Sequence, residues 1–325
     1  MQFSFPDFPR RIDWAILAAI AVVTSVLGWA LGFSGPHSNH LSVVVQFLIL
    51  LLFVSYVPCR TLFPLPVTVL CLILWAGLAV VTNGYATYVL AATNLPLWDS
   101  TFAAADHLFG LDHVALRDFA GSNEFLSNVL VFAYVNTATP LLVVVFLLIA
   151  RGDIERLANT VSILAISVTA TLVLFTIFPA IGAYPYFGMT VEHAPFLAKA
   201  PTNSWYAHYA ALRDGSMRAF PRDDWKAIVD FPSFHAIYTL IGLYAVAHIR
   251  LLAIIYMAFS AVVLVSTLPI GGHYFVDVIA GFIIWAVAIR IVEGQAAWVR
   301  WAPAVPAFSA DGLSWLYRLT RSPAR

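Results

Sequence analysis

Long apolar stretches recur along the chain and are separated by shorter polar segments. Several of them reach the roughly 20 residues that a bilayer-spanning helix needs, since a helix rises about 1.5 Å per residue through a hydrocarbon core of about 30 Å. The pattern predicts eight spans, at residues 14–33, 40–58, 66–91, 128–149, 160–181, 232–249, 251–268 and 273–292. We therefore expect an all-α integral membrane protein whose first helix is an anchor and not a cleaved signal peptide.

The composition leads to the same class of protein. Hydrophobic residues make up 61% of the chain and charged residues 10%, against about a quarter charged in soluble domains. A soluble fold of this length could not bury so much apolar surface. The two cysteines, Cys59 and Cys71, lie in or beside apolar segments without a metal-ligand spacing, so we expect them to pack as small hydrophobic residues.

Lysine and arginine are unevenly distributed between the two sides that eight alternating spans define. The side of both termini holds eleven of the seventeen cations, namely Arg10, Arg11, Arg60, Arg151, Arg156, Arg250, Arg290, Arg300, Arg318, Arg321 and Arg325. The opposite side holds Arg117, Lys199, Arg213, Arg218, Arg222 and Lys226. Because short cytoplasmic loops are enriched in these residues, we expect cytoplasmic termini and an outer face toward the periplasm, cell exterior or organelle lumen.

The polar segments divide the chain into three parts. Residues 1–62 form two additional N-terminal spans, residues 63–293 a six-helix membrane domain, and residues 294–325 a basic cytoplasmic tail. Two long polar stretches of the central part, 94–127 and 182–231, face outward. The first mixes leucines with Asp99, Asp106, Asp112 and Asp118, which favours an amphipathic cover in the membrane interface, with its acids in solvent.

The start of the sixth span carries a histidine in a setting suited to phosphate. The sequence Phe231-Pro232-Ser233-Phe234-His235 places proline near the first turn of the predicted helix. A helix N-terminus offers unpaired backbone N–H groups and a partial positive charge. His235 is therefore a candidate for contact with a phosphate group.

The start of the eighth span carries a second histidine. His273 and Asp277 are four residues apart, so they share a helix face and the carboxylate can orient one ring nitrogen while the other attacks. Such a pair alone is expected by chance in many chains. Here the antiparallel span between them brings His235 and His273 to the same outer face, near the depth of lipid phosphates. The remaining histidines show no metal-ligand pairing, so we expect no metal site.

These residues carry a family resemblance. Pro232-Ser233-Phe234-His235 and Gly271-Gly272-His273-x-x-x-Asp277 resemble signature motifs of the type 2 phosphatidic acid phosphatase superfamily. They are most similar to its branch containing fungal inositol phosphorylceramide synthase and the sphingomyelin synthases. The resemblance covers residues 66–292 and implies a phosphatidic-acid-phosphatase-like bundle formed by the last six spans.

The resemblance also implies a mechanism. His273, oriented by Asp277, attacks the phosphorus and forms a phosphohistidine, while His235 acts as general acid and then as general base. Ser233, Gly271 and Gly272 would help to hold the phosphate oxygens. Neither a metal nor a cofactor is implied.

The sequence departs from the phosphatase pattern at two cationic positions. No Lys-x-x-x-x-x-x-Arg-Pro motif is present, and Ser266-Thr267 stands where phosphatases carry Ser-Arg. Arg213, in the outer loop, is the best replacement cation. Because a phosphodiester carries one charge fewer than a phosphomonoester, the missing cations favour headgroup transfer.

The leading hypothesis is thus a lipid phosphotransferase that moves a phospho-headgroup from a phospholipid to a ceramide-type or diacylglycerol-type alcohol. The alternative within the superfamily is a lipid phosphate or pyrophosphate phosphatase, in which water is the acceptor. A transporter is the alternative of a different class, but the ionisable residues lie at helix starts on one face and not at the bilayer midplane. The expected partners are these lipids and the bilayer, with no nucleic acid; the oligomeric state stays open.

Overall fold

The computed structural model describes residues 9–33, 64–189, 195–197, 205–221, 226 and 228–294, which form helices and no strand. The long helices are α1 (Arg11–Ala30), α4 (Pro64–Ala91), α9 (Ile154–Ile177), α13 (Arg250–Thr267) and α14 (Phe275–Glu293). Shorter elements are α5 (Asp99–Leu108), α6 (His113–Gly121), α7 (Glu124–Val135), α8 (Ala138–Arg151), α10 (Ala183–Tyr186), η2 (Pro195–Leu197), α11 (Tyr206–Asp214) and α12 (Phe234–Val246).

The prediction of an all-α membrane protein with several spans is confirmed. Five helices, α1, α4, α9, α13 and α14, are long and apolar enough to cross a bilayer. They correspond to the first, third, fifth, seventh and eighth predicted spans. The sixth corresponds to α12, a shorter apolar helix of 13 residues. The second predicted span and the C-terminal tail beyond Gly294 lie outside the described residues.

The fourth predicted span, 128–149, is wrong as a single straight helix. The structure divides it into α7 and α8, which are bent by 50° at the break. Pro140 explains the position of the break, because proline has no N–H to donate to the carbonyl of Asn136 and its ring clashes with that carbonyl in a continuous helix. Thr137 at the break donates its hydroxyl to the carbonyl of Tyr134, 2.7 Å away. If α7 and α8 cross the bilayer together, they form one further span beside the five long helices.

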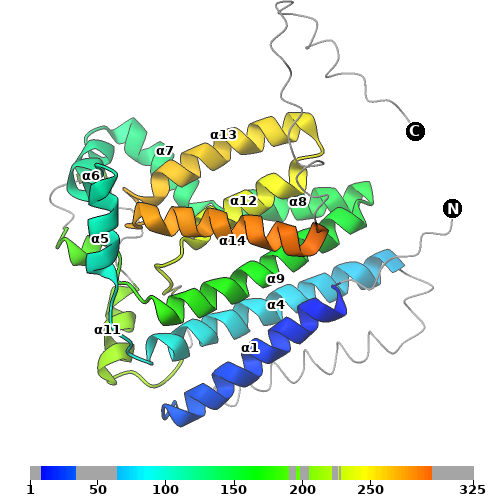
Figure 1. Ribbon diagram of the computed structural model, residues 1–325. Helices are drawn as coiled ribbons and strands as arrows, with labels where there is room; N and C mark the ends of the chain where they lie inside the picture. Colours follow the sequence, from blue (N-terminus) through cyan, green and yellow to red (C-terminus); the bar gives the residue numbers. More distant parts are fainter. Residues whose placement is uncertain are drawn as a thin grey trace, which may run out of the picture.

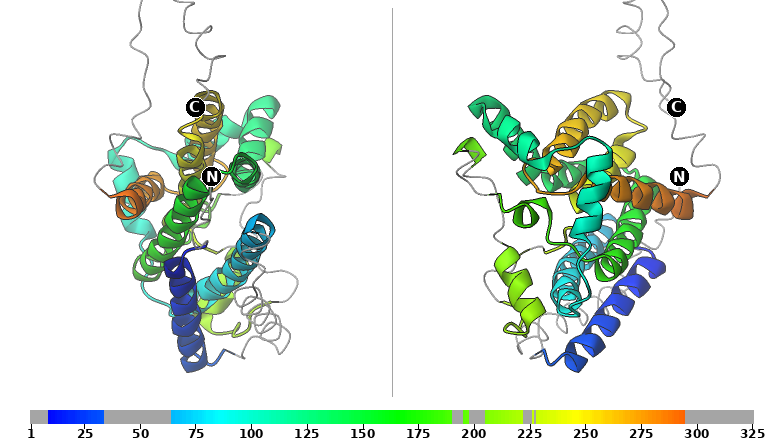
Figure 2. Two further views of the ribbon diagram at one scale, coloured as in Figure 1. Left: turned by 90° about the vertical axis from the view of Figure 1, so that its right-hand side faces the viewer. Right: turned by 60° about the vertical axis from the view of Figure 1, so that its left-hand side comes forward.

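Helix α9 lies at the centre of the bundle and packs against α1, α4, α8, α12 and α14 (Figures 1 and 2). Its buried side chains contribute to two hydrophobic clusters, one with α1, α4 and α8, the other with α12 and α14. Large apolar side chains such as Val26, Phe146 and Ile255 remain more than half exposed. Such an apolar outer surface fits a bundle surrounded by lipid.

Polar contacts are concentrated at the two ends of the bundle. At one end, Arg10 donates to Ser162 of α9, and Arg156 pairs with Glu293 at the end of α14 over 3.1 Å. At the opposite end, α5 and α6 cover the start of α14 (Figure 1). The start of α9 and the end of α14 therefore share one end of the molecule, as the predicted alternation of spans requires.

The expectation of an interfacial cover with solvated acids is wrong for the first two of its four aspartates. The segment forms the two short helices α5 and α6, and Asp99 and Asp106 in α5 are buried. Leu108 and Phe109 are exposed instead. The acids face inward because they accept hydrogen bonds from backbone groups at the start of α14 and before α10, which supply the partners that a buried carboxylate needs.

Candidate active site

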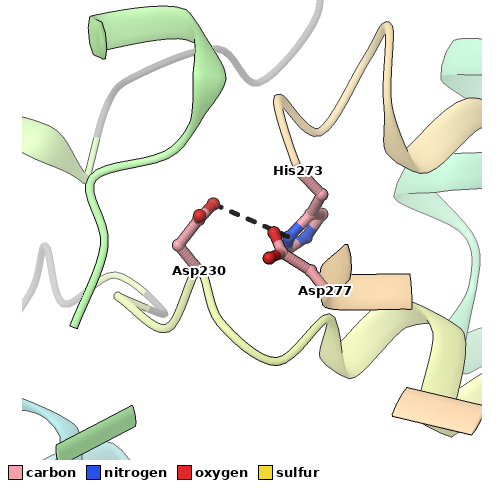
Figure 3. A group of neighbouring side chains, drawn as sticks. All are labelled: Asp230, His273 and Asp277. Carbon is pink, nitrogen blue, oxygen red and sulfur yellow. Dashed lines mark hydrogen bonds and ion pairs between the residues drawn. The ribbon is translucent and has the colours of Figure 1, made fainter. Parts of the chain in front are cut away.

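His273 lies in the turn before α14, where two carboxylates approach one nitrogen of its ring. Its Nδ1 lies 3.3 Å from Oδ2 of Asp277 and 3.6 Å from Oδ1 of Asp230, and all three residues are buried. Both carboxylates point toward the ring (Figure 3). Since a carboxylate accepts from Nδ1–H, this tautomer leaves the lone pair on Nε2.

Asp230 is a site residue that the sequence interpretation did not include. Its Oδ2 and Oδ1 of Asp277 are buried without a hydrogen-bond partner in the described part of the chain. Burial, followed by the negative charge of Asp277, raises the pKa of the Asp230 carboxyl well above its usual value. Oδ2 of Asp277 lies nearer to Nδ1 than Oδ1 of Asp230 does, 3.3 Å against 3.6 Å, so Asp277 is the better candidate for the residue that orients the ring.

His235 is brought close to His273 from the first turn of α12. The two ring centroids are 5.9 Å apart. On its other side His235 stacks on Tyr134 of α7, with ring centroids 3.9 Å apart. A phosphoryl group near Nε2 of His273 can thus be reached by a second imidazole whose ring plane is fixed by an aromatic neighbour.

The starts of α12 and α14 are joined directly. The backbone N–H of Ser233 donates to the carbonyl of Asp277 over 3.1 Å. Gly281 permits the approach, because a Cβ at that position would lie 3.1 Å from both Cβ of Ala236 and the carbonyl oxygen of Ser233. Close helix packing therefore sets the distance between the two histidines.

Helix α5 holds the residues that surround His273. Asp99 accepts from the backbone N–H groups of Ile181 and Gly182 and from the Tyr274 hydroxyl, each at about 3.0 Å. Asp106 accepts from the backbone N–H of Phe275 over 2.6 Å and of Val276 over 3.2 Å. The two acids tie the start of α14 to the segment before α10.

We expect Asp106→Ala to destabilise the protein and to reduce turnover. The change removes the acceptor of two backbone N–H groups and of His113 Nε2, which lies 2.8 Å away. Unpaired buried donors make a loss of about 3 kcal/mol reasonable, with a fall of several degrees in Tm. Asp106→Asn keeps one acceptor and should lose less. Thermal unfolding in detergent measures both; an Asp106→Ala protein as stable as wild type would contradict this account.

Most of the groups that were predicted to hold phosphate form hydrogen bonds within the protein. The Ser233 hydroxyl caps α12 by accepting from Ala236 N–H, and the amides of Gly271 and Gly272 donate to the carbonyls of Ser266 and Leu268. Arg213 donates to the carbonyl of Leu95 over 2.7 Å. Their role in holding phosphate stays a prediction without support from these contacts.

Two backbone N–H groups at the start of α12 are available to bind a phosphate oxygen. The backbone N–H groups of Phe234 and His235, in the first turn of α12, have no acceptor within the described ranges. Unpaired N–H groups at a helix N-terminus suit a phosphate oxygen. One of them belongs to His235, which carries the second imidazole, and the other to the residue before it.

Three ligand atoms in the site lie close enough for one cation. One atom each of Asp230, His273 and Asp277 fall within 4.8 Å of one another. Two carboxylates and an imidazole are a ligand set that a divalent ion accepts. A chelation experiment is therefore needed to test whether the site works without a metal ion.

The family resemblance is supported by comparison with known proteins. Residues 100–291 match the PAP2 superfamily, and this match spans more than half of the 325-residue chain. No curated protein and no solved structure matches the chain. The matched range begins in α5 and ends in α14, so it includes both histidines together with Asp106, Asp230 and Asp277, while Asp99 lies one residue before it. The chain therefore belongs to the PAP2 superfamily.

Proposed function

We propose that this protein transfers a phospho-headgroup from a phospholipid to a lipid alcohol, as in the branch of inositol phosphorylceramide and sphingomyelin synthases. Membership of the PAP2 superfamily indicates lipid phosphatase or phosphotransferase activity. The observation that carries the proposal is the His273 ring, whose Nδ1 lies beside Asp277 and whose centroid lies 5.9 Å from that of the His235 ring. This arrangement suits a nucleophile paired with an acid and base.

The reaction would proceed in two displacements at phosphorus. Nε2 of His273 attacks, the bond to the diacylglycerol oxygen breaks, and His235 gives that oxygen its proton. His235 then removes the proton from the acceptor hydroxyl, whose oxygen attacks the phosphohistidine and releases His273. Protons balance over the cycle because the one donated in the first step is recovered in the second.

The surroundings of Thr267 support a phosphodiester substrate. Thr267 is fully buried, its hydroxyl donates to the carbonyl of Leu264, and its own carbonyl accepts from His273 N–H. The position at which phosphatases carry an arginine thus holds a short neutral side chain turned into its own helix. A substrate with a single negative charge needs fewer cationic partners than a phosphomonoester.

The alternative is a phosphatase of the same superfamily, with water in place of the lipid alcohol. Purified protein in mixed micelles should be given a phospholipid labelled in its headgroup phosphate, together with ceramide or diacylglycerol. The proposal predicts labelled product lipid that depends on the acceptor, at a rate above the release of water-soluble phosphate. Faster hydrolysis of phosphatidic acid than any headgroup transfer would favour the phosphatase.

The same assay tests whether the site needs a divalent cation. Preincubation with EDTA should leave transfer unchanged, because the proposed steps use imidazole and carboxylate groups alone. Loss of activity that a divalent ion restores would instead assign Asp230, His273 and Asp277 to a metal.

We expect the site to face away from the cytoplasm, on the basis of the lysine and arginine distribution. In a background with Cys59→Ser and Cys71→Ala, a Ser216→Cys variant before α12 should react with a membrane-impermeant thiol reagent in intact cells. A Glu155→Cys variant at the start of α9 should react only after permeabilisation. Both positions are exposed. The opposite labelling pattern would reverse the orientation.

A further inference from the structure

A buried arginine outside the histidine site has no counter-ion among the residues that the structure describes. Arg117 of α6 is 1% exposed, and its Nε and Nη1 have no hydrogen-bond partner within the residues that the structure describes. Its guanidinium carbon lies 4.1 Å from the centre of the Tyr184 ring. An aromatic face stabilises a cation partially, but it accepts none of the guanidinium N–H groups in the manner of an anion.

A cavity adjoins this guanidinium. It has a volume of about 130 Å³ and is lined by Val114, Arg117, Asp118, Phe187, Gly188 and Met189. A Cβ built on Gly188 would meet no atom within 4 Å, so the wall is open at that point. A space of this size resembles cavities that hold one small organic group, and thus accommodates a headgroup phosphate but not a whole lipid.

We propose that Arg117 and this cavity bind the phosphodiester of a bilayer phospholipid, at a site separate from His273. The buried guanidinium would pair with a phosphate oxygen through a charge-assisted hydrogen bond. Asp118, which is exposed and lines the same cavity, disfavours a second negative charge on the ligand. The site therefore selects a singly charged diester over a dianionic phosphate.

The neighbouring surface favours a lipid as the source of that phosphate. Val114 is 40% exposed, Phe187 42% and Phe119, two residues beyond Arg117, 68%. Apolar side chains at the opening of a polar cavity suit a ligand whose acyl chains remain in the bilayer. The Tyr184 ring that covers Arg117 also touches Gly272, beside His273, so one side chain lies between the two sites.

The test measures binding without turnover. Thermal unfolding of the full chain in a neutral detergent should be followed with dioctanoyl phosphatidylglycerol, with dioctanoylglycerol, which lacks the phosphate, and with inorganic phosphate. We expect the phospholipid to raise Tm by at least about 3 °C, and the other two to have little effect. A full shift with inorganic phosphate would overturn the assignment to a lipid.

Two variants locate the effect. Arg117→Met should reduce the shift, with only donor binding at the His273 site remaining, and should leave the unliganded protein at least as stable as wild type, because it removes an unpaired buried charge. Arg151→Met, which removes an exposed arginine, is the matched control and should keep the shift. If Arg117→Met does not fold, Val114→Trp fills the opening with Arg117 unchanged and should also reduce the shift. A phospholipid shift as large in the folded variants as in wild type would overturn the proposal.

Discussion

Replacing His273 with alanine should reduce turnover by about 10⁴-fold or more, which places it below detection in most lipid assays. The change removes the atom that attacks phosphorus, and no neighbouring side chain takes over that role. Residual rates after loss of a nucleophile come only from binding and electrostatic stabilisation. The measurement is the initial rate of headgroup transfer at saturating donor lipid. Retention of more than a few per cent of the activity would contradict the assignment of His273.

A covalent label tests the same assignment independently. Wild-type protein given a phosphate-labelled donor without acceptor should acquire an acid-labile, base-stable label, as expected for phosphohistidine, and His273→Ala should acquire none. His248→Ala is the matched control. That histidine pairs with Asp153 over 3.2 Å near the start of α9, at the opposite end of the bundle. Its loss should leave both the rate and the label close to wild type.

The long helices and the pair of His273 and Asp277 could be predicted because each depends on residues that are close together in the sequence. Apolar length located the long helices within a few residues, since the bilayer thickness fixes how many residues a span needs. The spacing between His273 and Asp277 is a property of one helical turn, so their proximity follows from the sequence alone. Antiparallel spans were enough to place His235 on the same face.

The features that were missed depend on tertiary contacts. Asp230 directly precedes Phe231 and the motif that ends in His235, yet only the joined starts of α12 and α14 bring it to the His273 ring. Asp99 and Asp106 are seven residues apart and therefore share a face of α5, but that periodicity does not indicate whether the face is buried. Pro140 was a readable signal, because proline inside an apolar run predicts a break.

Arg117 shows how charge counting can conceal a buried group. It is the only lysine or arginine between residues 94 and 127, and it was counted as one of six cations on the outer face. Charge counts assume exposed side chains, whereas this one is covered by Tyr184. Its partner, the Tyr184 ring, comes from a segment 67 residues later (184 − 117), a pairing that no local pattern specifies.

Replacing Asp277 should be the second most damaging change, with a graded outcome. Its Oδ2 accepts from the backbone N–H of Tyr274 over 2.8 Å and from His273 Nδ1 over 3.3 Å. Asp277→Ala loses both contacts and the charge, so we expect a decrease of about 10³-fold in kcat. Asp277→Asn keeps an oxygen for both donors but not the negative charge that stabilises imidazolium, so about 10²-fold is expected.

Asp230→Asn is the matched comparison, because Asp230 approaches the same nitrogen of the His273 ring. Because burial raises the pKa of the Asp230 carboxyl and Asp277 lies nearer to Nδ1, an amide of the same shape should replace Asp230 with less electrostatic change, and kcat should stay within about fivefold of wild type. The ratio between the two asparagine variants is thus the decisive quantity, and parallel measurements of Tm separate it from misfolding. Equal losses in Asp230→Asn and Asp277→Asn would mean that both carboxylates contribute to the function of the His273 ring. A larger loss in Asp230→Asn would make Asp230 the residue that orients His273.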